Sequence, residues 1–540
     1  MTAARSTVLV LSALTSISAA AFADNPPVTI AVDAAANKHA IDPKIYGVAF
    51  ATPADLAALN APLNRMGGNA TSGYNWKQNA TNLGNDWYFE SYPQDGGGTP
   101  GASADQFISD TKGAGAQPMI TIPLVGWVAK LGAGRSILPS FSVAKYGNQC
   151  GVDPYDSDAG NGLKPDCSTP ITRNDVHDSY VKDSTDNEQK WVKHLAQTWG
   201  KSNKGGVPYY IMDNEPSIWF STHRDAHPKG PHADEYRDKV IAASAAIKAV
   251  DPNAKVVATE EWGWEGYFYS GFDQQYAAEH GYTKWPDHHK EQHGEDYIPW
   301  LLDEWKAAGH PVDVVSVHFY PQGAEDSNDD STNTQLLRNR STRQLWDPNY
   351  VSESWIGAPV YLIPRMQKWI KKDYYPGTPT AITEYNWGDE GHINGATTQA
   401  DIYGIFGLYG LDMATRWTVP AANTPTYKAM QMYRNYDGNK SMFGDTSVST
   451  VPSSNPDDLS AFGAVRASDG AMTVMVINKD LSGNTPVTLN LAHFTQSGSA
   501  QVWRLTSSNT IQHLSNIAWS GGALSDTAPP QSITLYVLPK

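Results

Sequence analysis

Eight short apolar runs alternate with helix-like stretches between residues 45 and 420, and this alternation decides the expected fold class. Strand-sized runs separated by amphipathic helices are typical of βαβ units and a parallel sheet. Eight such units are the number that closes a (β/α)8 barrel. The runs are residues 45–50, 63–67, 118–125, 208–212, 255–259, 312–319, 380–383 and 413–419. A doubly wound sheet is the alternative, but no glycine-rich phosphate loop follows the first run.

Helical periodicity fills the gaps between these runs. Residues 188–199 place Trp191, Leu195 and Trp199 on one face, since they are spaced four residues apart. Further helices are expected at residues 233–250, 296–306 and 363–372. The sequence therefore predicts an α/β fold, a (β/α)8 TIM-like barrel, over residues 45–424.

The pattern changes after residue 424. Short β-like runs separated by Asn, Ser, Gly and Asp clusters replace the alternation, and no strong helical pattern is present. This pattern of short β-like runs between polar clusters favours an additional all-β sandwich domain at residues 425–540. A β-like run also precedes the barrel, and we expect residues 24–44 to add a strand to that sandwich. The C-terminal runs are residues 462–465, 472–477, 487–491, 500–503 and 533–537.

The first 23 residues resemble a secretory signal peptide. Arg5 supplies a positive start, residues 7–20 are small or apolar, and Ala-Phe-Ala at 21–23 forms an A-x-A cleavage site. No later stretch approaches the roughly 20 apolar residues that a membrane span needs. We therefore expect a secreted protein, extracellular or periplasmic, without a membrane segment.

Charge narrows the class of partner. The formal net charge is −16 with only 18% charged residues, and no basic cluster stands out. This balance disfavours nucleic acid and anionic membrane surfaces. It fits a soluble protein whose partner is neutral. We also expect a monomer.

Cys150 and Cys167 are the only cysteines of the chain. In an oxidising compartment a pair this close in sequence is expected to form one disulfide. A closed loop of that size stabilises a fold by roughly 3 kcal/mol in the chain-entropy model. A two-thiolate metal site is the alternative, but it needs more ligands than the neighbouring sequence offers.

Two glutamates each follow a β-like run and precede a chain-breaking residue. Glu215 follows the fourth run and precedes Pro216, and Glu384 follows the seventh run shortly before Gly388. At the carboxyl ends of barrel strands they would lie where TIM-barrel active sites are built. Two carboxylates are the minimum equipment for hydrolysing a glycosidic bond. The alternative interpretation is two solvated acids without a role.

Other strand ends carry polar or aromatic residues that suit a sugar site. Arg65 lies near the end of the second run and could hold a carboxylate ionised, and His318 and Tyr320 end the sixth run beside the seventh. Aromatic rings can stack on the apolar faces of sugars, and their recurrence at one barrel end favours substrate binding over core packing. The tryptophans concerned are Trp127, Trp262, Trp387 and Trp417.

Several longer segments resemble glycoside hydrolase family 44. For the acid/base segment they are Met-Asp-Asn-Glu-Pro-Ser-Ile-Trp at 212–219 and Thr-His-Arg-Asp-Ala-His-Pro at 222–228. For the nucleophile segment they are Ile-Thr-Glu-Tyr-Asn-Trp-Gly at 382–388 and Gly-His-Ile-Asn-Gly-Ala at 391–396. Residues 65–71 and 340–348 are also similar to that family. Met66 departs from it, because the family pattern there has Trp.

The resemblance implies a barrel joined to a β-sandwich and an endo-acting, retaining β-1,4-glucanase, with cellulose-type glucans or xyloglucan as substrate. It implies that Glu215 is the acid/base, that Glu384 is the nucleophile, and that Asn214 hydrogen-bonds the sugar 2-hydroxyl. No cofactor is expected for catalysis. Two alternatives stay open: a barrel hydrolase for another β-linked backbone such as xylan or mannan, and a catalytically silent carbohydrate-binding protein.

An acidic loop suggests a structural metal. Asp153, Asp156 and Asp158 lie close together in a Gly-containing stretch, and hard cations such as Ca²⁺ take several oxygen ligands. The family resemblance makes a structural calcium an expectation here, with Glu90 as a further ligand. The alternative is a merely solvated loop.

Overall fold

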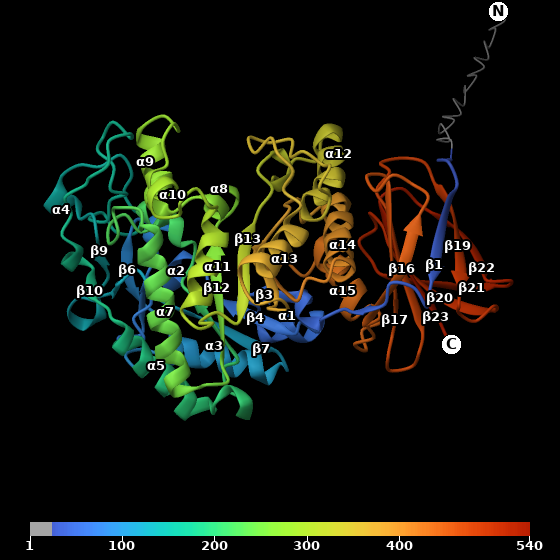
Figure 1. The fold of residues 1–540 in the computed structure, drawn as a ribbon, viewed down its shortest axis with the longest axis horizontal. Helices are drawn as coiled ribbons and strands as arrows, with labels where there is room; N and C mark the ends of the chain where they lie inside the picture. Colours follow the sequence, from blue (N-terminus) through green and yellow to red (C-terminus); the bar gives the residue numbers. More distant parts are fainter. Residues whose placement is uncertain (1–23) are drawn as a thin grey trace, which may run out of the picture.

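The computed structural model describes residues 24–540. The predicted signal peptide, residues 1–23, lies outside the described residues. Figure 1 shows two parts side by side, a barrel surrounded by helices and a domain made of β-strands. Among residues 24–540, no helix is long and apolar enough to cross a membrane.

Eight parallel strands close into a barrel, which confirms the expected fold class. Every strand falls on one of the eight apolar runs, and each pairs with its neighbours in chain order before the last strand pairs with the first. The strands are β3 (Gly47–Ala49), β4 (Leu63–Met66), β7 (Gln117–Ile122), β11 (Tyr209–Met212), β12 (Lys255–Glu261), β13 (Val314–Phe319), β14 (Thr380–Tyr385) and β15 (Met413–Arg416). Their inward side chains fill the barrel with a separate apolar cluster that includes Leu63, Met119 and Ile211.

Helices cover the outside of the barrel and bury apolar residues against it. In α5 (Thr185–Trp199), Trp191 and Leu195 are buried, and Ser184 caps the first turn by accepting from the N–H of Asn187. The other long helices are α1 (Pro53–Leu59), α3 (Ala102–Gly113), α7 (Ala233–Val250), α9 (Gly271–Glu279), α11 (Tyr297–Ala307), α12 (Thr332–Ser341), α13 (Leu362–Asp373), α14 (Ile393–Leu408) and α15 (Pro425–Arg434).

The second domain is one long sheet folded over its own core. Ten strands take part, and β1 lies between β16 and β19 although it precedes the barrel in sequence (Figure 1). Apolar residues from both arms of the sheet, such as Ile30 and Tyr536, form one buried cluster. The strands are β1 (Val28–Asp33), β2 (His39–Ala40), β16 (Thr446–Pro452), β17 (Leu459–Val465), β18 (Met472–Asn478), β19 (Thr485–Ala492), β20 (Gly498–Leu505), β21 (Gln512–Trp519), β22 (Ala523–Ala528) and β23 (Ser532–Leu538).

The two domains share a packed interface around α14. This helix is buried almost all round and contacts β17, β18 and β23 of the sheet. A side chain at Gly404 would collide with the ring of Phe462, so the helix and the sheet touch closely. Helix α15 lies in the stretch expected to be sandwich, yet it packs against α14 and α1 of the barrel. Thr424 caps it and Pro425 opens it, a helix start that the sequence reading did not register.

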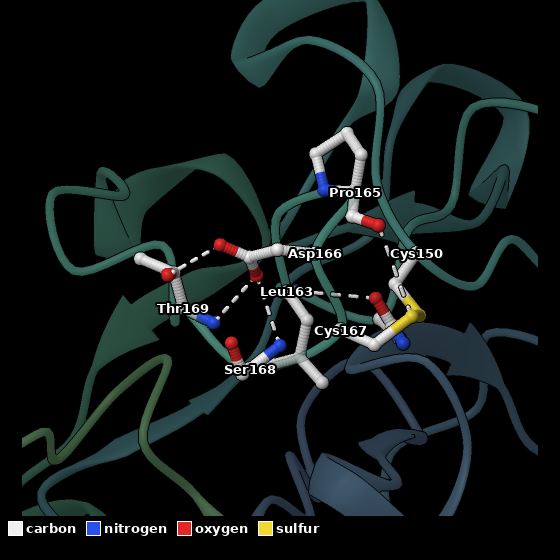
Figure 2. Close-up of a disulfide and its surroundings, with 8 residues drawn as sticks. Cys150, Leu163, Pro165, Asp166, Cys167, Ser168 and Thr169 are labelled. Atoms are coloured by element: carbon white, nitrogen blue, oxygen red, sulfur yellow. Dashed lines mark hydrogen bonds between the residues drawn. A yellow bond between two sulfur atoms is a disulfide. The ribbon is translucent and has the colours of Figure 1, made fainter.

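A long irregular excursion leaves the barrel after β7 and carries the disulfide. Cys150 and Cys167 are bonded, as expected, and their Cα atoms are 5.0 Å apart. Figure 2 shows the turn beside them, where the Asp166 carboxylate accepts from the backbone N–H of Ser168 and of Thr169. Short sheets brace this region: β5 (Ala80–Asn82) with β6 (Glu90–Pro93) and β9 (Leu138–Pro139), and β8 (Trp127–Ala129) with β10 (Tyr180–Lys182).

Candidate active site

The two glutamates lie at the carboxyl ends of β11 and β14. The backbone of Glu215 is left-handed, with φ of 46°, a conformation that costs of order 1 kcal/mol or more outside glycine. Its N–H donates to the carbonyl oxygen of Glu260, 3.0 Å away. This bond ties the strained turn to the end of β12 and directs the carboxylate toward His318 on β13.

The carboxylates of Glu215 and Glu384 face each other across the barrel mouth. One oxygen of each, together with a ring nitrogen of His318, lie within 4.8 Å of one another. The side chains of Glu215 and Glu384 are 14% and 6% exposed, whereas His318 is not exposed at all. The two acids are therefore the solvent-facing members of the cluster. Carboxyl separations of about 5–5.5 Å are typical of retaining glycosidases, and about 6.5–9.5 Å of inverting ones.

Glu384 is held by one cation and one hydroxyl. Arg65 on β4 donates from Nη1 to Oε1 at 2.6 Å, and Tyr320 donates to Oε2 at 2.8 Å. Burial raises the pKa of Tyr320 well above its usual value, so its phenol stays a donor. These two contacts fix the orientation of the carboxylate and place a positive charge against it.

His318 lies between two carboxylates. Its Nδ1 is 2.9 Å from Glu215, and its Nε2 is 3.1 Å from Glu260 on β12. Burial lowers the pKa of His318, but the charge of Glu384 and the hydrogen bonds to Glu215 and Glu260 outweigh this and raise it to about 10. At neutral pH the ring is therefore an imidazolium that donates from both nitrogens.

Glu215 itself has the character of an acid. Burial raises its pKa above the usual value, His318 opposes this shift, and the negative charge of Glu384 adds to it. A raised pKa favours the protonated form of the carboxyl group, which can give its proton to a leaving group.

Asn214 and Asp213 anchor the end of β11. Asn214 accepts from Arg65 at 3.0 Å and from the N–H of Gly68 at 3.1 Å, and it is almost fully buried. The Asp213 carboxylate accepts from the N–H of Val125 at 3.1 Å and from that of Asn214 at 2.7 Å. These bonds place Asn214 beside Glu215, and its contact with the sugar 2-hydroxyl stays a prediction.

The four tryptophans differ in what they can do. Trp417 is half-buried, and its ring faces the Arg65 guanidinium at 5.9 Å and covers Gly68. Trp387 is 3% exposed and donates to the Ser341 hydroxyl at 2.9 Å. The expectation that Trp387 stacks on sugar was therefore wrong, because its ring is part of the core.

Trp127 and Trp262 contact residues outside the glutamate cluster. Trp127 packs edge-on against His177, and the indole N–H of Trp262 donates to Gln274 at 3.0 Å. Both rings are half-buried, so each has a surface that a ligand can reach. Their role in substrate binding stays a prediction.

The acidic loop places Asp153 and Asp156 near enough to Glu90 to affect its pKa. Glu90 is 3% exposed and its Oε1 has no hydrogen-bond partner. Burial raises its pKa to about 8, and Asp153 and Asp156 add to the shift. Asp158 instead uses both oxygens at the start of the helix α4 (Val143–Tyr146), where it accepts from Ser142 and from the N–H of a neighbouring residue at 2.7 Å. Its assignment as a metal ligand stays a prediction, since Asp153 likewise accepts at both oxygens, from Trp87 and from the N–H of Tyr155.

Three groups of described residues have metal-ligand geometry, and two of these groups contain a carboxylate that is paired with an arginine or a lysine. Arg65 neutralises Glu384 in the catalytic cluster, and Lys372 lies 2.6 Å from Asp373 in a second group. The three groups are Glu215, His318 and Glu384; His232, Asp287 and Glu291; and Glu295, Asp303 and Asp373. We assign no metal to them.

The sequence analysis missed Glu260. This residue is completely buried and contacts both Arg65 and His318. The available signal was the same one that marked Glu215 and Glu384, since an acid pair, Glu260-Glu261, follows the fifth apolar run.

Two opposed carboxylates at the mouth of a TIM-like barrel, one with a raised pKa and one beside an arginine, are the equipment of a glycoside hydrolase. Comparisons with known proteins agree. Residues 80–323 match the model of glycoside hydrolase family 44. The structure of CelM2, a bifunctional glucanase-xylanase from a metagenome library, is 58% identical, with 95% of this chain and 99% of that chain covered and a TM-score of 0.93.

Two further relatives carry the family assignment. A Paenibacillus polymyxa xyloglucanase from family 44, solved with xyloglucan, is 27% identical over 96% of this chain and 100% of that chain, with a TM-score of 0.78. Endoglucanase A of Paenibacillus lautus is 29% identical over 95% of this chain and 72% of that protein. The chain belongs to glycoside hydrolase family 44. It is a glycoside hydrolase that needs no catalytic cofactor, and its substrate class is polysaccharide.

Proposed function

We propose that this chain is a retaining endo-β-1,4-glucanase in which Glu384 is the nucleophile and Glu215 the acid/base. The observation that carries this proposal is the separation of the two carboxylates, whose facing oxygens lie within 4.8 Å. Facing oxygens this close favour the short carboxyl separation of a retaining enzyme over the wider one of an inverting enzyme, which needs room for a water between the second carboxylate and the sugar.

In the first step, Glu384 attacks the anomeric carbon and forms an ester with the sugar. The bond from that carbon to the glycosidic oxygen breaks, and the proton of Glu215 goes to the leaving oxygen. Arg65 and Tyr320 hold Glu384 in the orientation for attack, because each occupies one of its oxygens.

In the second step, Glu215 works as a base. It takes a proton from water, the water oxygen attacks the anomeric carbon, and the ester to Glu384 breaks. The product keeps the β configuration, and both glutamates return to their starting states. Glu215 can donate a proton only while it is protonated, and its pKa is raised. Activity should therefore fall when the pH rises above that pKa.

The preferred backbone rests on the relatives. The P. polymyxa relative is a xyloglucanase and CelM2 acts on glucan and xylan. We therefore place β-1,4-glucan first, with xyloglucan as a decorated form of it. A second activity on xylan is the alternative that the 58% identity to CelM2 favours.

The test measures release of reducing ends from carboxymethyl-cellulose, xyloglucan, xylan and mannan, and follows the anomeric proton of the first product by NMR. We expect cleavage of the β-1,4-glucans with the β-anomer formed first. Initial formation of the α-anomer would exclude the retaining mechanism, and cleavage of mannan alone would replace the substrate assignment.

We also propose that Glu90, Asp153 and Asp156 hold a structural calcium. Glu90 has an unpartnered buried oxygen, and Asp153 and Asp156 raise its pKa, so this group of carboxylates fits a hard cation. Chelation by EDTA should then lower the melting temperature by several degrees, since a ligand at 100 times its Kd adds about 2.7 kcal/mol.

Two variants make this calcium test specific. Glu90→Gln should lose the difference between calcium and EDTA. Asp158→Asn should keep it, because Asp158 is bonded to the start of α4. An EDTA effect that is the same in wild type and Glu90→Gln would remove these residues as ligands.

A further inference from the structure

Glu260 occupies the centre of the catalytic cluster without facing the substrate. Its carboxylate has no exposed surface. Oε1 accepts from the hydroxyls of Ser316 and Thr383, at 2.5 and 2.8 Å. Oε2 is shared by two cations, Arg65 at 3.0 Å and His318 at 3.1 Å. Three barrel strands, β4, β13 and β14, thus converge on one side chain of a fourth.

The shared oxygen keeps two positive groups side by side. Nη2 of Arg65 and Nε2 of His318 are only 3.3 Å apart, and both are fully buried. Two like charges at that distance repel strongly where water is excluded. The negative charge on Oε2 offsets this repulsion, since both groups donate to it.

Each of the two cations also contacts one catalytic glutamate. Arg65 reaches Glu384 at 2.6 Å, and His318 reaches Glu215 at 2.9 Å. We propose that Glu260 is the positioning residue of the active site: its charge keeps His318 protonated beside Arg65 and so orients both Glu215 and Glu384. This role rests on the proposed function of the two glutamates.

Loss of the negative charge on Glu260 should lower the pKa values of the groups around it. The acidic protons nearest to Glu260 are those on His318 and Glu215, and the other charged or titratable groups around them are Arg65, Glu384, Tyr320 and Glu261. Removing one negative charge from this set makes every neighbouring proton easier to lose. The alkaline limb of activity must then move to lower pH.

Glu260→Gln is the direct test. Its amide has the same shape, its oxygen can still accept from Arg65 and His318, and its NH2 can donate to the two hydroxyls. We expect kcat to fall by about 10²–10³-fold, since positioning is lost. We expect KM to change by less than about threefold, because the residue does not face substrate, and the alkaline limb of kcat/KM to move down by about one pH unit.

The neighbouring residue supplies a matched control. Glu261 is equally buried, follows Glu260 directly, and contacts Ser217 instead of the two cations. Burial raises its pKa well above the usual value, which favours the neutral form that Glu261→Gln mimics. This variant should keep the wild-type pH profile, and Glu260→Asp should recover part of kcat and the position of the alkaline limb.

A measurement on the wild type covers the case in which Glu260→Gln does not fold. NMR of histidine labelled with ¹⁵N, with His318→Gln used for assignment, reports the protonation of His318 directly. An imidazolium at pH 8 supports the proposal. A neutral ring at pH 8, or a Glu260→Gln pH profile identical to that of Glu261→Gln, overturns it. If the wild type cleaves no glycan, the proposed function fails while this readout still decides the role of Glu260.

Discussion

Replacing Glu384 with glutamine is expected to lower kcat on β-1,4-glucan by about four orders of magnitude while the fold stays intact. The amide cannot form the glycosyl ester, and removal of a covalent nucleophile has effects of this size. The variant keeps a similar shape between Arg65 and Tyr320, so circular dichroism and the melting temperature should change little.

The two glutamates can be told apart by chemical rescue. With Glu384→Gly, azide should enter the space left by the carboxylate and yield the α-glycosyl azide, because it attacks the face that the nucleophile used. With Glu215→Gln, hydrolysis of polysaccharide should fall by about 10²–10⁴-fold. A dinitrophenyl glycoside should still form the ester, since its leaving group needs no proton.

The outcome of these experiments also separates the competing interpretations. Glu261→Gln serves as the control, because it alters a buried acid at the same barrel end without touching either catalytic carboxylate. Wild-type rates in Glu384→Gln would contradict the nucleophile assignment. A β-glycosyl azide from Glu384→Gly, together with an α-glycosyl azide from a Glu215 variant, would reverse the roles of Glu215 and Glu384.

The barrel could be predicted because its strands are buried on both faces. Burial is complete along strands such as β13 and β14, and β13 is apolar over most of its length. Strand β21 lacks such a signal, since most of its residues are exposed and polar, and it was missed together with β16 and β22. An edge-like strand is fixed by its partners and not by its own composition.

Only those residues of the site that lie near the carboxyl ends of the barrel strands could be predicted from the sequence. Position after a strand located Arg65, Glu215 and Glu384, because parallel strands bring their carboxyl ends to one side of the barrel. Position alone could not tell that Trp387 turns into the core, since Ser341 and the other groups that receive it come from distant segments. Nor could it give the gap between the glutamates.

The interface between the domains contains a buried ion pair whose loss should cost about 3–5 kcal/mol. Lys479 after β18 donates to Asp401 on α14 at 2.6 Å, and both side chains are 2% exposed. Lys479 also donates to the carbonyl oxygen of Pro456 at 2.8 Å. Removing one partner leaves the other charge buried and unpaired. The free-energy cost of that unpaired charge exceeds the net contribution of the hydrogen bonds to stability.

The experiment is a double-mutant cycle on the free energy of unfolding in urea. Asp401→Asn and Lys479→Met should each destabilise strongly, and the double variant less than the sum of both, because no charge is then left unpaired. The control is Asp457→Asn, which breaks the pair with Arg343 at the same interface. Those side chains are 20% and 25% exposed, so a loss below about 1 kcal/mol is expected. Additive effects of Asp401→Asn and Lys479→Met would show that the pair does not couple the two domains.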